Sequence, residues 1–240
     1  MRNHKRKITG IIAGAVVAFL AAFCVYYVND YYHSEAVVED YLQGTAQVTV
    51  SEINEGLFLD GAGEETAMIF YPGAKVEYTA YVPLLMELAE EGVDCFLVKM
   101  PCNLAIFGMN KADDIMVAYD YENWYMAGHS LGGAMAASYA SEHIADLDGI
   151  ALLAAYPTKS LISEGFEVLS VYGSEDFVLN MEKLEEGREF VPEAYTEICI
   201  EGGNHAQFGA YGAQEGDGTA TISAEEQWTT TIEEIMKMIE

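Results

Sequence analysis

The chain has 240 residues, of which 51% are hydrophobic and 21% are charged. This length and apolar content are enough for one large domain with a buried core, which excludes a mostly disordered chain. After residue 28 there are 39 acidic and seven basic residues, a formal net charge of −32. Nucleic-acid binding depends on clusters of lysine and arginine, so no nucleic-acid partner is expected.

The N-terminus combines a basic tail, residues 1–7, with a segment, residues 8–28, that carries no charge. This segment matches the length of one membrane-spanning helix. In a cleaved signal peptide the apolar part is usually about 7–15 residues long and ends at small residues of the A-x-A kind, which are not well placed here. We therefore predict a single-pass signal anchor in the cell membrane, with the tail cytoplasmic and the rest extracellular. Cleavage and secretion are the alternative.

Residues 29–42 are expected to form a stalk, followed by one globular domain at residues 43–240. The domain begins with two β patterns, Gln47–Ser51 and Leu57–Asp60, on either side of a turn that contains asparagine and glycine. This arrangement indicates a β-hairpin.

Beyond the hairpin, short apolar runs typical of strands alternate with amphipathic stretches typical of helices. The expected strands are Ala67–Tyr71, Cys95–Met100, Trp124–Ala127, Gly149–Ala154, Val168–Tyr172 and Tyr195–Ile200. The expected helices are a stretch with Tyr81, Leu84, Leu85 and Leu88 on one face, Lys111–Tyr119, Leu131–Glu142, Asn180–Glu185 and a last helix that starts at a Ser223-x-x-Glu226 capping box. Strands without polar alternation are buried on both faces, so the predicted fold class is α/β, a mostly parallel sheet flanked by helices.

Three cysteines follow the N-terminal segment, and their odd number does not indicate a disulfide framework. Cys95 and Cys199 lie in apolar, strand-like runs and are expected to be buried. The sequence has no CxxC pair and no closely spaced cluster of histidine and cysteine. We therefore predict neither a metal site nor an organic cofactor.

The sequence NWYMAGHSLGG, residues 123–133, runs from a strand pattern into a helix pattern through a serine with glycine two positions before and after it. A strand that enters a helix through one tight turn strains the turn residue, and flanking glycines prevent collisions there. Such a nucleophile elbow exposes the hydroxyl of Ser130, toward which the helix directs its free N–H groups and positive dipole end. Ser130 is therefore the candidate nucleophile.

A serine hydroxyl needs a base to take its proton. Within the domain the candidates are His129, His143 and His205. His129 is adjacent to Ser130 and should point away from it, and His143 lies some three turns along the following helix. His205 follows a strand pattern at the sheet edge where parallel α/β sheets place their sites, so we select His205 as the base.

A carboxylate must orient the base, and Asp176 follows the strand pattern VLSVYG at the same edge, with its neighbour Glu175 as the alternative. An oxyanion needs two further donors. One is expected to be the N–H of Leu131, directly after the nucleophile, and the other should come from the loop after the strand AMIFY. In that loop Ala74 is preferred over Lys75, because the preceding glycine allows a close backbone approach.

Five segments in order, FYPGAKVE, LVKMPCNLAIF, GHSLGG, YGSED and GGNHAQFG, resemble the α/β-hydrolase superfamily, in particular the small bacterial α/β-hydrolases related to dienelactone hydrolase. The resemblance covers about residues 45–240. It implies the α/β-hydrolase fold and a serine hydrolase with Ser130, Asp176 and His205 as its triad, in the chain order that this fold uses. Dienelactone hydrolase itself uses a cysteine nucleophile, which argues against dienelactone as the substrate.

The chain has no room for a large lid, because only about a dozen residues separate the strand patterns that end at Ala154 and begin at Val168. An open site suits small ester substrates better than long acyl chains, which need a deep apolar pocket. Lys99 is a candidate to hold a substrate carboxylate, or to pair with one of two nearby aspartates. The expected substrate-binding residues are Lys99, Phe107, Phe177 and Phe208.

Together these features predict a membrane-tethered, extracellular serine hydrolase that cleaves small carboxylic esters through an acyl-enzyme. The same groups in an acyltransferase would pass the acyl group to an alcohol or amine, and in a peptidase they would cut amide bonds. A non-catalytic surface binding module is the alternative from another class. The sequence indicates no particular oligomeric state.

Overall fold

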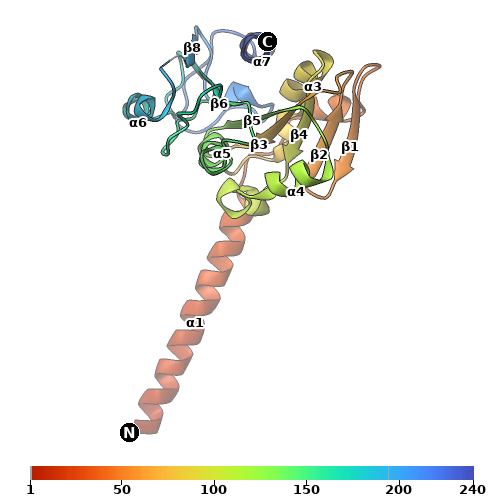
Figure 1. Cartoon of the computed structure of the whole chain (residues 1–240). Helices are drawn as coiled ribbons and strands as arrows, with labels where there is room; N and C mark the ends of the chain where they lie inside the picture. Colours follow the sequence, from red (N-terminus) through yellow and green to blue (C-terminus); the bar gives the residue numbers. More distant parts are fainter. Residues whose placement is uncertain (1, 194) are drawn as a thin grey trace. The chain divides into compact units, whose positions relative to one another are not determined.

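The computed structural model describes residues 2–193 and 195–240, apart from the side chains of residues 2–13, 21 and 23. The chain forms two compact units, one up to Tyr31 and one from Tyr32 to Glu240. The first unit is a single helix, α1 (Arg2–Asn29), drawn in red and orange in Figure 1. The predicted span, residues 8–28, falls on α1 and lies partly outside the described residues. Among the residues that are described, no helix has both the length and the hydropathy needed to cross a membrane.

The second unit is built on one eight-stranded sheet in the order β1-β2-β4-β3-β5-β6-β7-β8. The strands are β1 (Thr49–Ile53), β2 (Gly56–Asp60), β3 (Thr66–Tyr71), β4 (Asp94–Val98), β5 (Asn123–His129), β6 (Gly149–Leu153), β7 (Glu167–Gly173) and β8 (Thr196–Ile200). The predicted hairpin is confirmed by the antiparallel pairing of β1 with β2, and β2 also pairs antiparallel with β4. From β4 to β8 every neighbouring pair is parallel, as the apolar runs predict.

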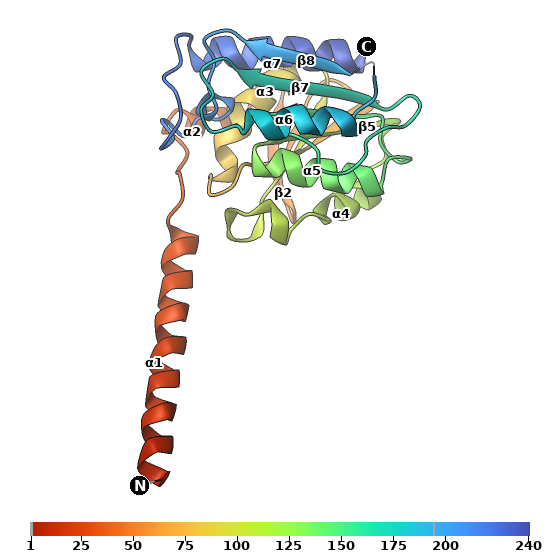
Figure 2. The same cartoon turned by 90° about the vertical axis from the view of Figure 1, so that its left-hand side faces the viewer.

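Helices cover both faces of this sheet. They are α2 (Val38–Tyr41), α3 (Val82–Glu90), α4 (Lys111–Ala118), α5 (Leu131–Glu142), α6 (Met181–Gly187) and α7 (Ala224–Ile239). Figures 1 and 2 show α4, α5 and α6 on one face and α3 and α7 on the other. Short 3₁₀ turns lie at Tyr78–Tyr81, Pro101–Asn103, Ala105–Phe107, Arg188–Phe190 and Ala206–Phe208.

Side chains of the central strand β3 alternate between two hydrophobic clusters, one on each face. Ala67, Ile69 and Tyr71 pack with residues of α4 and α5, whereas Met68 and Phe70 pack with residues of α3 and α7. All five are buried. Because both faces of the strand meet apolar neighbours, its sequence lacks the polar alternation of a half-exposed strand.

The parallel strands all end at one edge of the sheet, which lies at the left-hand side of Figure 2. Ser130, Asp176 and His205 follow β5, β7 and β8 at this carboxyl edge. Between β6 and β7, residues 154–166 contain no helix or strand. The topology therefore gathers the three predicted residues at the edge where open α/β sheets bind ligands, without a large lid between these two strands.

The second unit begins earlier than the predicted domain boundary at residue 43. Tyr32 forms a parallel bridge with Val76, and Val38 in α2 is only 1% exposed. Residues 32–42 thus pack on the domain instead of forming the expected stalk. The physical reason is that removing an apolar side chain such as Val38 from water stabilises the folded domain.

Two local expectations had different outcomes. The capping box of α7 is confirmed: the Ser223 hydroxyl accepts from the Glu226 N–H at 3.1 Å, and the Glu226 carboxylate accepts from the Ser223 N–H at 2.8 Å. Cys95 is buried as predicted, but the prediction for Cys199 is wrong, because this residue is exposed. It lies on β8, the last strand of the sheet, where side chains have fewer neighbours.

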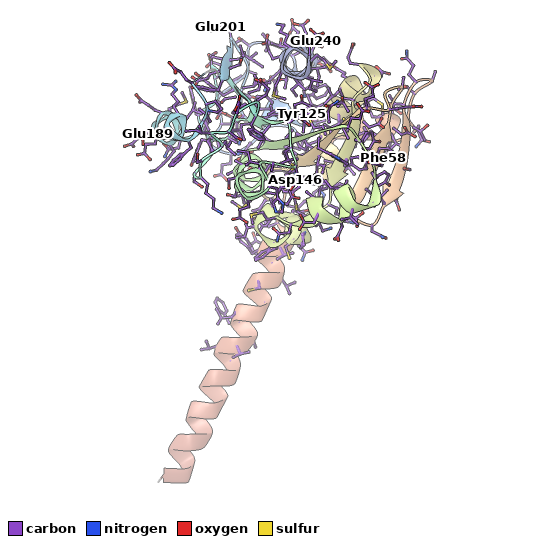
Figure 3. The ribbon with its side chains drawn as sticks, in the orientation of Figure 1. Phe58, Tyr125, Asp146, Glu189, Glu201 and Glu240 are labelled. Atoms are coloured by element: carbon purple, nitrogen blue, oxygen red, sulfur yellow. The ribbon has the colours of Figure 1, made fainter. Side chains whose placement is uncertain are left out.

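Carboxylates are spread over the surface of the second unit. Figure 3 labels four of them, Asp146, Glu189, Glu201 and Glu240, and all four are exposed. They come from different parts of the chain, so the negative charge is not confined to one patch. This distribution fits a well-solvated acidic surface.

Replacing Val38 with alanine tests whether residues 32–42 belong to the domain. We expect Val38→Ala to lower the free energy of unfolding by about 2 kcal/mol, because buried methyl groups are removed from the core. The matched control is Val37→Ala, whose side chain is 46% exposed and whose effect should stay within about 0.5 kcal/mol. Urea unfolding measures both variants, and equal effects would show that this segment is not packed on the core.

Candidate active site

The turn between β5 and α5 is sharp, and Ser130 occupies it with backbone angles φ 53° and ψ −124°. A positive φ strains any residue other than glycine. The turn closes because two glycines approach neighbouring backbone. A Cβ on Gly128 would lie 2.7 Å from the nitrogen of Gly133, and a Cβ on Gly132 would lie 2.2 Å from the carbonyl oxygen of Tyr71. This is the geometry of a nucleophile elbow, and it holds Ser130 at the carboxyl edge of the sheet.

His205 and Asp176 meet at the same edge. Nδ1 of His205 lies 2.9 Å from Oδ2 of Asp176, and the two side chains are 2% and 0% exposed. Oδ1 of Asp176 accepts hydrogen bonds from the N–H groups of Val178 (2.9 Å) and Leu179 (2.8 Å). Because the carboxylate only accepts, the hydrogen-bond network assigns the His205 proton to Nδ1 and leaves Nε2 as an acceptor. In this state a histidine can take a proton from a hydroxyl.

The alternative acid and the other histidine candidates have different surroundings. Glu175 directs its N–H to the Gly203 carbonyl oxygen, and its carboxylate accepts from the neighbouring serine hydroxyl at 3.4 Å. His143 lies at the far end of α5, where its Nε2 is 3.9 Å from a carboxylate oxygen of Asp113. Of the two candidate acids, the structure brings Asp176 into contact with His205.

A glutamine that the sequence analysis did not single out holds the loop of His205. Gln227 on α7 is completely buried; its Oε1 accepts from the Asn204 N–H at 3.0 Å, and its Nε2 donates to the Asn204 carbonyl oxygen at 2.9 Å. One side chain thus fixes the peptide groups on both sides of Asn204, directly before His205. The sequence feature that could have indicated a buried glutamine is its position eight residues before Ile235, on the apolar face of an amphipathic helix.

Asp217 ties the loops of His205 and Asp176 together. Its Oδ2 accepts from the N–H of Ala206 at 2.9 Å, next to His205, and its Oδ1 accepts from the N–H of Phe177 at 3.3 Å, next to Asp176. A single carboxylate therefore links the two segments. The sequence carries no pattern for this contact, because Asp217 lies in an irregular stretch between the last strand and the last helix.

Ser130 and His205 line one cavity of about 240 Å³. The other lining residues are Leu131, Ala134, Ala154, Ala155, Tyr156, Val178, Leu179 and Asn180. These eight are mostly small or apolar, and none is acidic or basic. The volume is below the roughly 300–1,000 Å³ of typical ligand pockets, so the cavity fits a small uncharged group.

The first turn of α5 lies against the loop after β3. A Cβ on Gly132 would be 2.3 Å from the carbonyl oxygen of Pro72, so the two backbones touch. In this loop the N–H of Lys75 donates at 2.8 Å to a carbonyl oxygen in the segment after β4, which removes it from the candidate oxyanion donors. Within the part of the chain that the structure describes, the N–H groups of Leu131 and Ala74 make no hydrogen bond. Neither expected donor is therefore engaged by another group of the described chain.

The four expected substrate-binding residues do not line this cavity. Phe107 and Phe177 are 61% and 70% exposed, and Phe208 is fully buried with its ring centre 5.6 Å from that of His129. The ammonium group of Lys99 lies 5.4 Å from the centre of a tyrosine ring. Residues that follow β6 and β7 form the walls instead. These residues line the cavity because of how the loops after β6 and β7 fold at the sheet edge, and local sequence patterns do not predict loop conformation.

His129, directly before Ser130, is buried. Its Nδ1 lies 2.8 Å from the hydroxyl oxygen of Tyr81, and its ring centre is 4.5 Å from that of His205. Burial, and in second place the neighbouring His205, lower the pKa of His129 well below its usual value, opposed in part by the His205 backbone. The ring is therefore neutral at physiological pH, because its charged form would lose hydration.

The fold and this arrangement define a known class of protein. The model of the alpha/beta hydrolase family matches residues 67–229, and the chain belongs to this family. Similar solved structures include a predicted CIB-like hydrolase from Thermoplasma acidophilum, with 15% identity, a TM-score of 0.60 and coverage of 80% of this chain and 98% of that chain.

Two further solved structures are also similar. Est1E from Butyrivibrio proteoclasticus, solved with ferulic acid bound, has 14% identity, a TM-score of 0.55 and coverage of 74% of this chain and 91% of that chain. Naproxen esterase, the carboxylesterase NP of Bacillus subtilis, has 12% identity, a TM-score of 0.56 and coverage of 84% and 95%. At these identities the likeness shows the fold alone. No curated protein matches the chain in sequence.

The pH dependence of stability tests the environment of His129. Since burial lowers the pKa of His129 in the folded domain, the unfolded chain binds a proton at this residue below about pH 6.5 while the folded chain does not. Its contribution to stability is therefore complete above about pH 6.5 and is lost as the pH falls. Urea unfolding at pH 7.5 and 5.5 measures this loss. We expect the free energy of unfolding to fall more steeply with decreasing pH in wild type than in His129→Gln, by up to about 1.4 kcal/mol per pH unit. Equal losses would contradict a buried, neutral ring.

Proposed function

We propose that the protein is a serine hydrolase that cleaves small carboxylic esters. The observation that carries the proposal is the contact of Asp176 with Nδ1 of His205, because it leaves Nε2 of the imidazole to accept a proton. His205 and Ser130 line the same cavity. A serine hydroxyl becomes a nucleophile when a histidine can take its proton and a carboxylate orients that histidine.

In the proposed reaction the Ser130 hydroxyl oxygen attacks the ester carbonyl carbon while Nε2 of His205 takes its proton. Asp176 holds the proton on Nδ1 and stabilises the positive imidazolium. The N–H groups of Leu131 and Ala74 stabilise the oxyanion of the tetrahedral intermediate. The intermediate expels the alcohol, which receives the proton from His205. Water, deprotonated by His205, then cleaves the acyl-enzyme, releases the acid and restores Ser130.

The shape and lining of the cavity support a small acyl group. The cavity of about 240 Å³ has alanine and leucine in its walls and can accept a short apolar group. Apart from His205, no acidic or basic side chain lines it that could hold a charged group. The names of two structurally similar proteins, a naproxen esterase and the ferulic-acid-bound Est1E, favour an ester as the bond that is cut. Acyl transfer is the second reaction that these groups could perform, and product analysis with an added alcohol separates transfer from hydrolysis.

Capture by a fluorophosphonate probe tests the nucleophile. We expect the folded wild-type chain to be labelled covalently and Ser130→Ala to lose the label together with ester hydrolysis, with kcat reduced by about 10⁶-fold. The matched control is Ser141→Ala on the same helix, whose hydroxyl donates to the Ser138 carbonyl oxygen at 2.7 Å and which should keep full labelling. A folded wild type that is never labelled would favour a binding module.

We also propose that residues 8–28 anchor the domain on the outer side of the cell membrane. The support is the length of this segment without charge and the basic residues before it. A tag placed after Glu240 should stay with the membrane fraction and be digested by protease added to intact cells, whereas a tag before residue 1 should be protected. Recovery of the C-terminal tag in the medium would indicate a cleaved signal peptide, and its protection in intact cells would contradict the orientation.

A further inference from the structure

A buried pair, Tyr81 and His129, lies between the loop after β3 and the turn of Ser130, and the reaction described above does not use it. Both side chains are buried. The Tyr81 hydroxyl oxygen is 2.8 Å from Nδ1 of His129 and accepts from the N–H of Gly73 at 3.1 Å. Each of these atoms would be costly to bury alone, so their pairing fixes both side chains.

The directions of these hydrogen bonds follow from the donors and acceptors. The Gly73 N–H can only donate, so it occupies a lone pair of the phenol oxygen and leaves the phenol proton to point at Nδ1 of His129. Burial raises the pKa of Tyr81, partly opposed by the Gly73 hydrogen bond, so the phenol keeps its proton. His129 then carries its own proton on Nε2.

The pair touches both halves of the proposed machinery. Gly73 directly precedes Ala74, a proposed oxyanion donor, and His129 directly precedes Ser130. The rings of His129 and His205 are 4.5 Å apart at their centres. Gly73 packs closely against the pair, because a Cβ on Gly73 would lie 2.8 Å from both Nδ1 of His129 and the Tyr81 hydroxyl oxygen.

We infer that Tyr81 and His129 are positioning residues that align the oxyanion loop with the base. Tyr81 fixes the residue before Ala74, so that the Ala74 N–H faces the site of the developing oxyanion. His129 supplies an uncharged ring beside His205, and this neutrality matters when His205 becomes positively charged during proton transfer, because two adjacent cations would repel. This inference rests on the serine hydrolase proposed above.

Substitution of Tyr81 by phenylalanine in the full chain tests the inference. The variant keeps the ring but frees the Gly73 N–H, so the loop can shift. With p-nitrophenyl acetate as the substrate we expect kcat to fall about 10- to 100-fold while KM changes less than about threefold, because the lost alignment acts on the transition state. The matched control is Tyr139→Phe. Tyr139 is also a buried tyrosine, and its hydroxyl donates to Asp113 in a hydrogen bond of 2.7 Å, outside the proposed site. The kcat of this variant should equal that of wild type.

A second pair of variants addresses His129 itself. His129→Gln can still accept from the Tyr81 hydroxyl and should retain more of kcat than His129→Leu, which cannot. Near-UV circular dichroism establishes that each variant is folded. The inference is overturned if Tyr81→Phe keeps kcat, if Tyr139→Phe loses as much, or if the glutamine and leucine variants are equally impaired. Absence of both probe labelling and ester hydrolysis in the wild type would instead defeat the proposed function.

Discussion

The structure depends on the close approach of three backbone segments around the turn at Ser130. The absence of side chains at Gly128 and Gly132 lets β5, the first turn of α5 and the loop after β3 come within contact distance. The positive φ of Ser130 has a cost of about 1–3 kcal/mol, which the packing of α5 on β5 and β6 must offset. The same contact places the first turn of α5 against Tyr71 and Pro72, the start of the loop after β3.

Around this turn, buried polar groups are held by partners from distant parts of the chain. Asp176 accepts from its own loop and from His205, and Gln227 on the last helix fixes the peptide groups before His205. A buried donor or acceptor that loses its partner costs about 1–3 kcal/mol, so each contact restricts the loops to one arrangement. Helix α7 is thus part of the support of the site, although it contributes no reacting group.

The acidity of the domain does not extend into the cavity. Most carboxylates lie on the surface, and within the described residues some of them pair with Lys159, Lys183, Arg188 and Lys237. The walls around Ser130 are small and uncharged. Shape and apolar contact would therefore select the substrate within the site, whereas the surrounding negative field disfavours the approach of anions.

Local patterns in the sequence determined the strands, the helices, the capping box and the serine turn, because hydrophobic periodicity and glycine spacing act over a few neighbouring residues. Whether Asp176 or Glu175 contacts His205 was open in the sequence, since adjacent loop residues point in different directions and only the folded loop selects one. Gln227, Asp217 and the cavity walls depended on contacts between segments far apart in the chain. The packing of residues 32–42 on the domain was decided in the same way, because an apolar residue in a short segment does not reveal which distant surface will cover it.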